Sequence, residues 1–526
     1  MKYLEFKIAV LERTGLDERA FRESGSEIYI AANLENFHGI CLLLHSILSS
    51  PVMLYFAEDN VKTSGVYTLR CGFLGKKIQR WVFVVVDIPK DNLNFPAISK
   101  DIVSAQLFER EIKEMFGLIP AGSPDVRRLR LHDEVWPDGY FPLRKEFVKP
   151  EKTNNTGKYY VFDRIEGEGV FEVPVGPVHA GIIGPGHFRF SVAGEPIINL
   201  ELRLGFAHRG AEKLFEGKSA KEAQIFSECI SGDAAFAHSL AFSLAVEQAA
   251  GIDVKENVKI NRAIGLELER IYNHINDIGG MAIDVAFSYS STLASIVKEN
   301  ILRLNEKLSK HRYLKGSNGV GQCALIKDKE SRVCLLEVLS GAKTDIDLLK
   351  NILFSSVSFM DKVDTTGTLH RKTAEDFGVT GLAGRASGLE LDLRRVFPGI
   401  YEKTSFEIIR GDKGDVLSRL NVRFNELAVA LRVITELSGQ INFSGKEDSP
   451  EAIIISGTGL GAVEGWRGPI IYWVKIGKEG KIERCKIVDA SFNNWQALSC
   501  CVHGNIIPDF PVCNKSFDFS YSGGDL

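Results

Sequence analysis

Hydrophobic and polar positions follow two different periodicities along the chain, and the change between them separates two parts. Apolar runs at residues 28–31 and 81–88 are short and rich in β-branched and aromatic side chains, which is typical of strands. Residues 104–116 place charged side chains over an apolar face at helical spacing, and Gly117 follows as a stop signal. We therefore expect a small α/β domain over residues 1–150.

The pattern becomes more helical after a polar, glycine-containing stretch at residues 149–158. We expect a linker at residues 151–160 and a second, larger domain over residues 161–526. Apolar positions at helical spacing predict helices within residues 219–251, 257–279, 291–310 and 411–439. Apolar runs at 470–476 and 481–488 flank a Gly-Lys-Glu-Gly turn and predict a hairpin. The predicted fold class is α+β, with a mainly α-helical second domain that carries a peripheral β portion.

Composition narrows the class of protein. The 526 residues carry a net charge of -4, with 44% hydrophobic and 25% charged residues, which is ordinary for a globular chain. We see no long basic block, so we expect no nucleic-acid partner and no direct docking on anionic lipid. The most apolar stretches, 40–56 and 234–250, are shorter or more polar than the roughly 20 apolar residues that a membrane span needs. A role at a membrane would therefore depend on partner subunits.

The nine cysteines are scattered, and no pair has C-x-x-C spacing. The N-terminal residues lack the apolar core of a signal peptide, so we expect reduced thiols in a cytosolic protein. Iron–sulfur clusters usually need four thiolates at recognisable spacing. We therefore expect no cluster and no metal bound within this chain.

A first group of motifs lies in the C-terminal part of the first predicted domain. It reads ERE-x-x-E-M-F-G at 109–117, then PD-x-RR at 124–128 and PLRK-x-F at 142–147. A charged helix followed by an arginine-rich tail can lie across another subunit and pair with its carboxylates, or it can be a solvated surface. The three linked motifs resemble the 30-kDa subunit of respiratory complex I. That resemblance implies a structural clamp that holds an assembly together.

A second group of motifs covers much of the larger domain, at residues 176–190, 204–213, 265–280 and 377–394. This series resembles the 49-kDa subunit of complex I and the large subunit of membrane-bound [NiFe] hydrogenases. The fusion of both modules in one chain is similar to the formate hydrogenlyase type of hydrogenase. The resemblance implies a hydrogenase-large-subunit-like fold.

One predicted helix carries ionisable residues on a single face. Glu267, Arg270, His274 and Asp277 recur at steps of three or four residues in an otherwise apolar segment. Buried charges need partners, and they often mark proton or electron paths. Together with Asp392, we assign these residues to proton coupling. The alternative is a structural network of ion pairs.

The motif His208-Arg209-Gly210 has a more definite role by resemblance. In complex I the arginine lies against the terminal [4Fe-4S] cluster of a neighbouring subunit, where a guanidinium favours the reduced cluster. We assign His208, Arg209 and Arg385 as candidate cofactor-binding residues, toward the cluster of the neighbouring subunit. The alternative for Arg209 is an ordinary surface arginine in a turn.

The cysteines that hold nickel and iron in the related hydrogenases are missing. Their places are taken by Ser231, Ala234, Ser520 and Gly523. These residues do not replace thiolates for soft metals. Cys229 and Cys513 lie near both places but out of register, so a residual metal site that uses them is an alternative. Gly184 also stands where membrane-bound hydrogenases have a glutamate in the proton route.

The quinone ligands of complex I are also missing, since Ile183 stands at the place of its histidine and Gly232 at that of its tyrosine. We expect a cavity to remain where the metal or the quinone would bind. We predict that His179, His187, Asp233 and His238 line this cavity, and we take them as the candidate catalytic residues. The alternative for each histidine is an ordinary core position.

Together these features predict an electron-transfer subunit of a complex I-like oxidoreductase, peripheral on the cytoplasmic face of a membrane. The implied partners are a small subunit with a [4Fe-4S] cluster, a membrane subunit resembling the quinone-chamber protein, and antiporter-like membrane subunits. Electrons would come from ferredoxin, NADH or formate and reduce an acceptor, with quinone as the candidate. One rival hypothesis is a non-catalytic scaffold. The other is an active [NiFe] hydrogenase, which the loss of all four cysteine ligands disfavours.

Overall fold

The computed structural model describes residues 3–151, 153, 156–180, 183–443 and 456–526. Its first part is a five-stranded sheet in the order β1-β2-β5-β4-β3, in which only the β2–β5 pair is parallel. The strands are β1 (Phe21–Ser24), β2 (Glu27–Ala32), β3 (Val52–Asn60), β4 (Val66–Gly75) and β5 (Arg80–Pro89), and a short pair follows, β6 (Asn94–Pro96) and β7 (Ile119–Ala121). The helices are α1 (Tyr3–Thr14), α2 (Phe37–Leu48), α3 (Val61–Ser64) and α4 (Gln106–Phe116). The predicted strands and the predicted helix of this part are confirmed, and α4 ends at Gly117 in a left-handed conformation.

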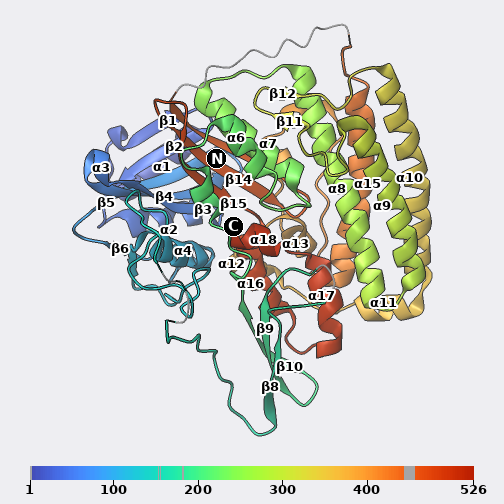
Figure 1. Cartoon of the computed structure of the whole chain (residues 1–526), viewed down its shortest axis with the longest axis horizontal. Helices are drawn as coiled ribbons and strands as arrows, with labels where there is room; N and C mark the ends of the chain where they lie inside the picture. The colour runs from blue at the N-terminus through green and yellow to red at the C-terminus, as the bar shows by residue number, and fades with distance from the viewer. Residues whose placement is uncertain (1–2, 152, 154–155, 181–182, 444–455) are drawn as a thin grey trace.

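The second part is dominated by four long helices that pack side by side, on the right of Figure 1. They are α8 (Glu256–Asp284), α9 (Ser288–Ser309), α10 (Lys329–Ser355) and α15 (Val416–Ser438). Shorter helices are α5 (Ala211–Phe215), α6 (Ala220–Ser227), α7 (Ala235–Ala250), α11 (Val357–Val363), α12 (Arg371–Asp376), α13 (Gly381–Ala386), α14 (Leu393–Val396), α16 (Ser491–Cys501), α17 (Phe510–Phe517) and α18 (Tyr521–Asp525). The α+β class is confirmed.

The helical pattern at 219–251 is not one helix. It is divided into α6 and α7 by a turn at residues 228–234, which contains Ser231 and Asp233. Serine, glycine and aspartate are weak helix formers because their side chains or free backbones favour caps and turns. The break therefore places two candidate site residues in a loop ahead of the N-terminus of α7.

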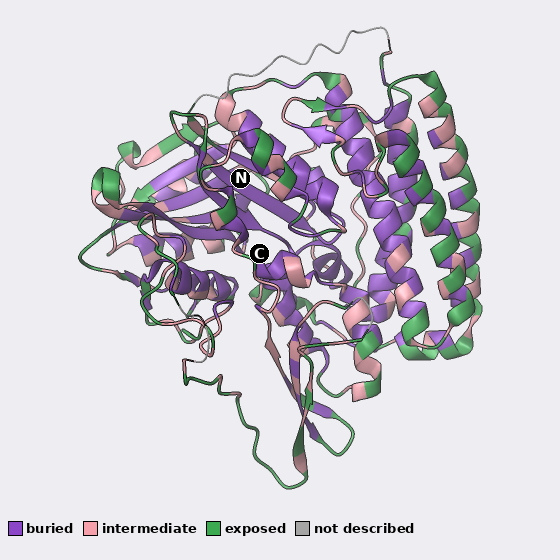
Figure 2. Cartoon of the chain, in the orientation of Figure 1, coloured by how far each residue is buried: buried purple, intermediate pink, exposed green. Residues whose placement is uncertain are grey.

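A three-stranded sheet lies at the centre of the molecule. The predicted hairpin is confirmed as β14 (Pro469–Ile476) and β15 (Ile482–Val488), and β13 (Gly457–Glu464) completes an antiparallel sheet in the order β13-β14-β15. Figure 2 shows these strands as largely buried.

Helix α7 lies directly on the backbone of β13. Gly457, Gly459 and Gly461 alternate along this strand, and a Cβ atom on Gly459 would lie only 2.0 Å from the carbonyl oxygen of Ala245 in α7. The absence of side chains on this face allows close contact between helix and strand. This contact fixes the position of α7 and of the loop that precedes it.

One apolar cluster and several ion pairs span the two parts. Trp473 of β14 packs on Phe56 of β3, with 5.0 Å between ring centroids. Lys486 of β15 donates to Glu111 of α4 at 2.6 Å. Figure 1 shows the first sheet against the central sheet, on the left of the molecule.

The arginine-rich tail contacts the second part of its own chain. Arg130 bridges Glu111 at 2.8 Å and the carbonyl oxygen of Gly524 at 2.9 Å. Lys145 pairs with Glu216 at 2.8 Å. The tail therefore joins the two parts of this molecule, and its role as a clamp within a larger assembly stays a prediction.

A second small sheet forms the predicted peripheral β portion. It contains β8 (Val170–Val175), β9 (His187–Ala193) and β10 (Ile197–Arg203), and it projects from the lower edge in Figure 1. The short strands β11 (Asn318–Gly319) and β12 (Gln322–Cys323) pair separately. Within the described ranges, we find no helix with the length and apolar character needed to span a bilayer.

Candidate functional site

A cavity of about 940 Å³ lies where the C-terminal segment meets α8 and α9. Its polar lining comes from five parts of the chain that are far apart in sequence. These residues include Ser231, Asp233, Asn273, Asn276, Asp284, Lys298, Arg312, Arg467, Asn514, Lys515, Asp518, Ser520 and Ser522. Ile183 and Gly232, at the places of the quinone ligands, also line it.

The positions of the missing cysteines meet at this cavity. The hydroxyl oxygens of Ser231 and Ser520 lie 2.8 Å apart, although 289 residues separate them along the chain. The backbone N–H of Gly523 donates to Ser520 at 2.9 Å, and that of Ala234 donates to the carbonyl oxygen of Ser231 at 3.1 Å. The four positions therefore form one cluster.

The donor set of this cluster does not fit a nickel–iron centre. Two hydroxyl groups, a methyl group and a glycine offer no thiolate to a soft metal. The described ranges also contain no group of three or more His, Cys, Asp or Glu side chains that could hold a metal ion. Cys513 lies 3.6 Å from Cys501, whereas Cys229 is exposed at the surface.

An ion pair forms the polar wall of the cavity. Arg467 donates to both carboxylate oxygens of Asp233, at 2.9 and 2.6 Å, and to Asp518 at 3.2 Å. Burial acts to raise the pKa of Asp233, but the Arg467 guanidinium outweighs it and holds the pKa below the ordinary value. The Asp233 side chain is still 40% exposed, so it can contact a molecule in the cavity.

Gly184, which stands where related hydrogenases have a glutamate, lies against the ring of Tyr521. A Cβ atom on Gly184 would lie 2.8 Å from the ring of Tyr521, which also lines the cavity. The ring therefore occupies the space that a longer side chain at position 184 would need.

The three candidate histidines do not line the cavity within the described part of the chain. His238 is buried behind it, 3.0 Å from the hydroxyl oxygen of Tyr472 and 3.1 Å from a carboxylate oxygen of Asp489. His179 lies in the connection between β8 and β9 and His187 begins β9, and they contact backbone carbonyl oxygens at 2.7 and 3.2 Å. Among the four predicted catalytic residues, the structure brings only Asp233 to the cavity.

Arg209 is exposed and holds the loop that leads to the cavity. Its guanidinium donates to the carbonyl oxygens of Cys229 and Ile230, at 2.8 Å each. His208 lies 2.7 Å from the carbonyl oxygen of Asp525, and burial lowers its pKa to about 4, so it is neutral at physiological pH. Arg385, which we grouped with these two residues, lies elsewhere, in a buried network of charges.

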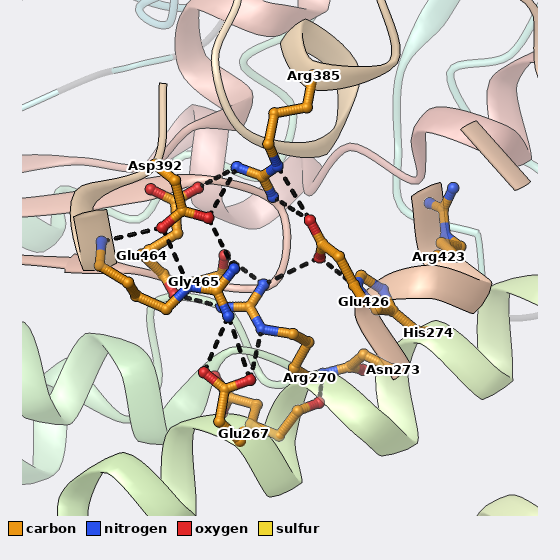
Figure 3. A network of polar contacts seen from close by, with 12 residues as sticks. Glu267, Arg270, Asn273, His274, Arg385, Asp392, Arg423, Glu426, Glu464 and Gly465 are labelled. Atoms are coloured by element: carbon orange, nitrogen blue, oxygen red, sulfur yellow. Dashed lines mark hydrogen bonds and ion pairs between the residues drawn. The ribbon is translucent and has the colours of Figure 1, made fainter. Parts of the chain in front are cut away.

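That network lies between α8, α15 and the central sheet (Figure 3). Glu426 of α15 is its centre and accepts from Arg385 at 2.6 Å, from His274 at 2.8 Å and from Arg270 at 3.3 Å. Arg385 also donates to Glu464 at 2.7 Å. All five side chains are buried.

The predicted helix face joins the same network. Glu267 accepts from Arg270 at 3.0 Å, from Arg394 at 3.0 Å and from the hydroxyl group of Tyr401 at 2.7 Å. Arg394 also pairs with Asp392 at 2.7 Å. The residues of other elements that pair with these charged side chains were not predicted from the sequence, namely Arg394, Tyr401, Arg423, Glu426 and Glu464.

Asp277 connects the helix face to the cavity. It pairs with Arg423 at 2.9 Å and lies 3.9 Å from Lys515, which lines the cavity. Burial and the nearby Asp518 carboxylate raise the pKa of Asp277 to about 7. Burial lowers the pKa of His274, three residues earlier, to about 4. The structural alternative, a network of ion pairs, is thus present, and a proton path through it stays a hypothesis.

Glu269 also links the helix α8 to the cavity loop. Its carboxyl oxygens accept the backbone N–H groups of Phe236 and Ala237, at 2.8 and 3.2 Å, in the first turn of α7. Burial raises the pKa of Glu269 to about 8, and Asp233 adds to this shift. A side chain of α8 thus caps the helix that follows Ser231 and Asp233.

Comparison with known proteins agrees with this arrangement of two modules. Residues 35–153 match the family described as "Respiratory-chain NADH dehydrogenase, 30 Kd subunit", and residues 284–455 match "Respiratory-chain NADH dehydrogenase, 49 Kd subunit". The chain is 32% identical to formate hydrogenlyase subunit 5 of Escherichia coli (strain K12), over 89% of this chain and 84% of that protein. This chain belongs to the family of fused 30-kDa and 49-kDa subunits. Members of this fused family are oxidoreductase subunits of complex I-like and hydrogenase-related membrane complexes.

Two further comparisons extend to proteins of respiratory complexes. The chain is 29% identical to a subunit of the NADH-quinone oxidoreductase of Bacteroides thetaiotaomicron, over 78% of this chain and 81% of that protein. The fold of part of this chain is similar to that of a chain in the structure of the membrane-bound sulfane sulfur reductase, an archaeal respiratory membrane complex. That match has a TM-score of 0.64 and 23% identity, and it covers 68% of this chain and 99% of that chain.

Proposed function

We propose that this subunit passes electrons from a [4Fe-4S] cluster in a neighbouring small subunit to an acceptor that binds in the cavity of about 940 Å³. The subunit would work at the cytoplasmic face of a membrane, with a quinone-chamber-like subunit and antiporter-like subunits as its membrane partners. It would bind no cofactor by itself. A quinone is the candidate acceptor. Ferredoxin, NADH or formate would be the ultimate donor.

The observation that carries this proposal is the position of the cavity. It lies where the missing cysteines meet, and its wall is the nearly buried Arg467 paired with the half-exposed Asp233. Arg209 holds the loop that contains Ser231 and Asp233, and its guanidinium is exposed for a partner. A positive charge at that place would favour the reduced form of a neighbouring cluster.

Proton supply is the second part of the proposal. Reduction of a quinone consumes protons, and Asp277 has a pKa of about 7, raised by burial and Asp518. Lys515 lies between Asp277 and the cavity. We propose that Asp277 and the charged face of α8, with Glu267, Arg270, His274 and beyond it Asp392, couple acceptor reduction to proton movement.

The scaffold hypothesis is favoured by a different observation. The polar groups of the cavity wall satisfy one another, since Asp233 pairs with Arg467, and Ser231 bonds to Ser520. A wall of this kind needs no ligand. An active [NiFe] hydrogenase is disfavoured because the donor set contains no thiolate at the four expected positions.

The test uses the purified complex with its clusters reduced by a low-potential donor. Cluster reoxidation is followed optically with ubiquinone and menaquinone analogues and with polysulfide, which is added because the structural relative is described as a sulfane sulfur reductase. We expect fast, saturable reoxidation by a quinone, and a loss of at least about tenfold in rate in the Asp233→Asn and Arg209→Met variants. Arg371→Met, in an exposed pair with Glu375 on α12 away from the cavity lining, is the matched control. Intact clusters that no quinone reoxidises would overturn the quinone proposal, and turnover that is unchanged in both variants would favour the scaffold.

A further inference from the structure

Two cysteines lie in contact near the candidate site, outside the cluster of Ser231, Ala234, Ser520 and Gly523. The Sγ atoms of Cys501, at the end of α16, and Cys513, in α17, are 3.6 Å apart. They are 2% and 1% exposed. The proposed function does not use this pair.

The two thiols have unequal surroundings. The hydrogen bond from Cys501 lowers the pKa of Cys513 against the effect of burial, and the Arg419 guanidinium lowers it further. Burial raises the pKa of the Cys501 thiol well above its ordinary value. One sulfur is thus suited to act as a nucleophilic thiolate, and its neighbour is suited to keep its proton.

The fold leaves space for this arrangement. A Cβ atom on Gly367 would lie 2.3 Å from the Sγ atom of Cys513, so a larger residue there would displace the thiol. Arg419 is held over the pair by the carbonyl oxygen of Gly367 at 2.9 Å and the hydroxyl group of Ser516 at 2.8 Å. The guanidinium is fixed by bonds to neutral groups, so its charge remains available to Cys513.

A second pair of buried cysteines gives an internal contrast. Cys71 of β4 lies beside Cys41 of α2, and burial raises its pKa well above the ordinary value. The charged group that acts on Cys71 is the Glu109 carboxylate, which raises the pKa further. Proximity is common to the two pairs, but only the pair of Cys501 and Cys513 has a cation beside it.

We propose that Cys501 and Cys513 form a redox-active dithiol whose oxidant is a compound with a sulfur–sulfur bond. The Cys513 thiolate attacks one sulfur of the oxidant and releases the other as a thiolate. Cys501 then loses its proton and attacks the mixed disulfide at Cys513, which releases the second thiolate. The two protein thiols are oxidised by two electrons, and one sulfur–sulfur bond of the oxidant is reduced.

Oxidation would change the wall of the cavity. A disulfide bond requires the two sulfurs to move from 3.6 Å to about 2.05 Å apart, which draws α17 toward α16. The chain continues directly from α17 into Asp518 and Ser520, both of which line the cavity. The redox state of the pair is thereby transmitted to the polar wall. Because both sulfurs are buried, the oxidant enters when this segment opens locally.

The test treats the full complex with oxidised glutathione, blocks the remaining thiols with an alkylating agent and maps the peptides by mass spectrometry. We expect a disulfide between Cys501 and Cys513 that dithiothreitol reverses. It should form at least about tenfold faster than a disulfide between Cys41 and Cys71, since each pKa unit changes the thiolate fraction by about a factor of ten. In a Cys501→Ser variant, glutathione should remain bound to Cys513.

Three results would overturn the proposal: no disulfide between Cys501 and Cys513 while the complex stays assembled, equal rates for the two pairs, or glutathione bound only at Cys229 or Cys500. The wild-type complex supplies the first two readouts, so a variant that fails to fold does not obscure them. None of the readouts depends on acceptor turnover, and the failure of the proposed function leaves the proposal intact.

Discussion

The second module contains two polar clusters that differ in how their charges are balanced. In the buried network between α8 and α15, Arg385 and Glu426 are fully enclosed, and their charges are balanced only by other side chains. At the cavity, Arg467 is nearly buried, but its partner Asp233 is 40% exposed. Two buried carboxyl groups of α8 lie toward the cavity: Asp277 is 3.9 Å from Lys515, and Glu269 accepts from the first turn of α7.

This difference predicts that the two clusters contribute unequally to the stability of the folded chain. An ion removed from water costs several kcal/mol, and a buried pair recovers this cost only through its partners, so loss of one partner is severe. A half-exposed carboxylate is solvated as well as paired, so its partner contributes less to folding. Loss of a partner in the buried network is therefore costly to folding, whereas the pair at the cavity can exchange a partner at lower cost when a molecule binds. The variants below test this contrast.

The largest effect is expected from the Arg385→Met substitution. The variant removes the cation between Glu426 and Glu464 and leaves buried carboxylates without their main partner. We expect a loss of about 3–5 kcal/mol in the free energy of unfolding, measured by urea denaturation at pH 7. Arg303→Met, in the exposed pair with Glu299, should cost less than about 0.5 kcal/mol. Equal losses in the two variants would contradict the contrast.

A smaller effect is expected at Glu269, the buried residue of α8 that caps the first turn of α7. Burial raises its pKa to about 8. Between about pH 4 and pH 8, the folded protein therefore keeps a proton on Glu269 that the unfolded chain has already released. The contribution of Glu269 is therefore fully present at low pH and is lost as the pH rises through 8. Glutamine does not titrate but keeps an oxygen for the N–H groups of Phe236 and Ala237.

The Glu269→Gln variant should consequently gain about 2.7 kcal/mol relative to the wild type when the pH rises from 6 to 9. The measurement is the difference in the free energy of unfolding between the two proteins at each pH. Other groups that titrate in this interval, including Asp277, are common to both proteins and cancel. A difference that does not vary with pH would mean that Glu269 is already ionised at pH 6.

The sequence predicted those parts of the fold that depend on local pattern. The helix at 104–116 and the strand at 81–88 have periodicity and stop signals within themselves, and the structure places α4 and β5 there. The break in 219–251 was missed because the N-terminus of α7 is capped by Glu269, from a helix further along the chain. Helix α10 was missed although Leu335, Leu339, Ala342 and Ile346 do carry helical spacing.

The candidate site was predictable only in part, for a related reason. Asp233 could be found because it lies between two positions that the resemblance marks. Its partner Arg467 lies 234 residues away and belongs to no motif that we recognised. The histidines were chosen for their chemistry, but His238 already has partners in Tyr472 and Asp489 within the core. Side-chain partners across elements are decided by tertiary packing, which a single sequence does not display.

The smallest effect on stability is expected at the cavity, with Asp233→Asn. The carboxylate is half-exposed, and Arg467 keeps a second partner in Asp518 at 3.2 Å, so the arginine is not left without a counter-charge. We expect a change of less than about 1 kcal/mol in the free energy of unfolding. If Asp233→Asn instead destabilised the chain as much as Arg385→Met, the pair at the cavity would be as fixed as the buried network. A wall that could not alter its charge would then favour the scaffold over a reactive site.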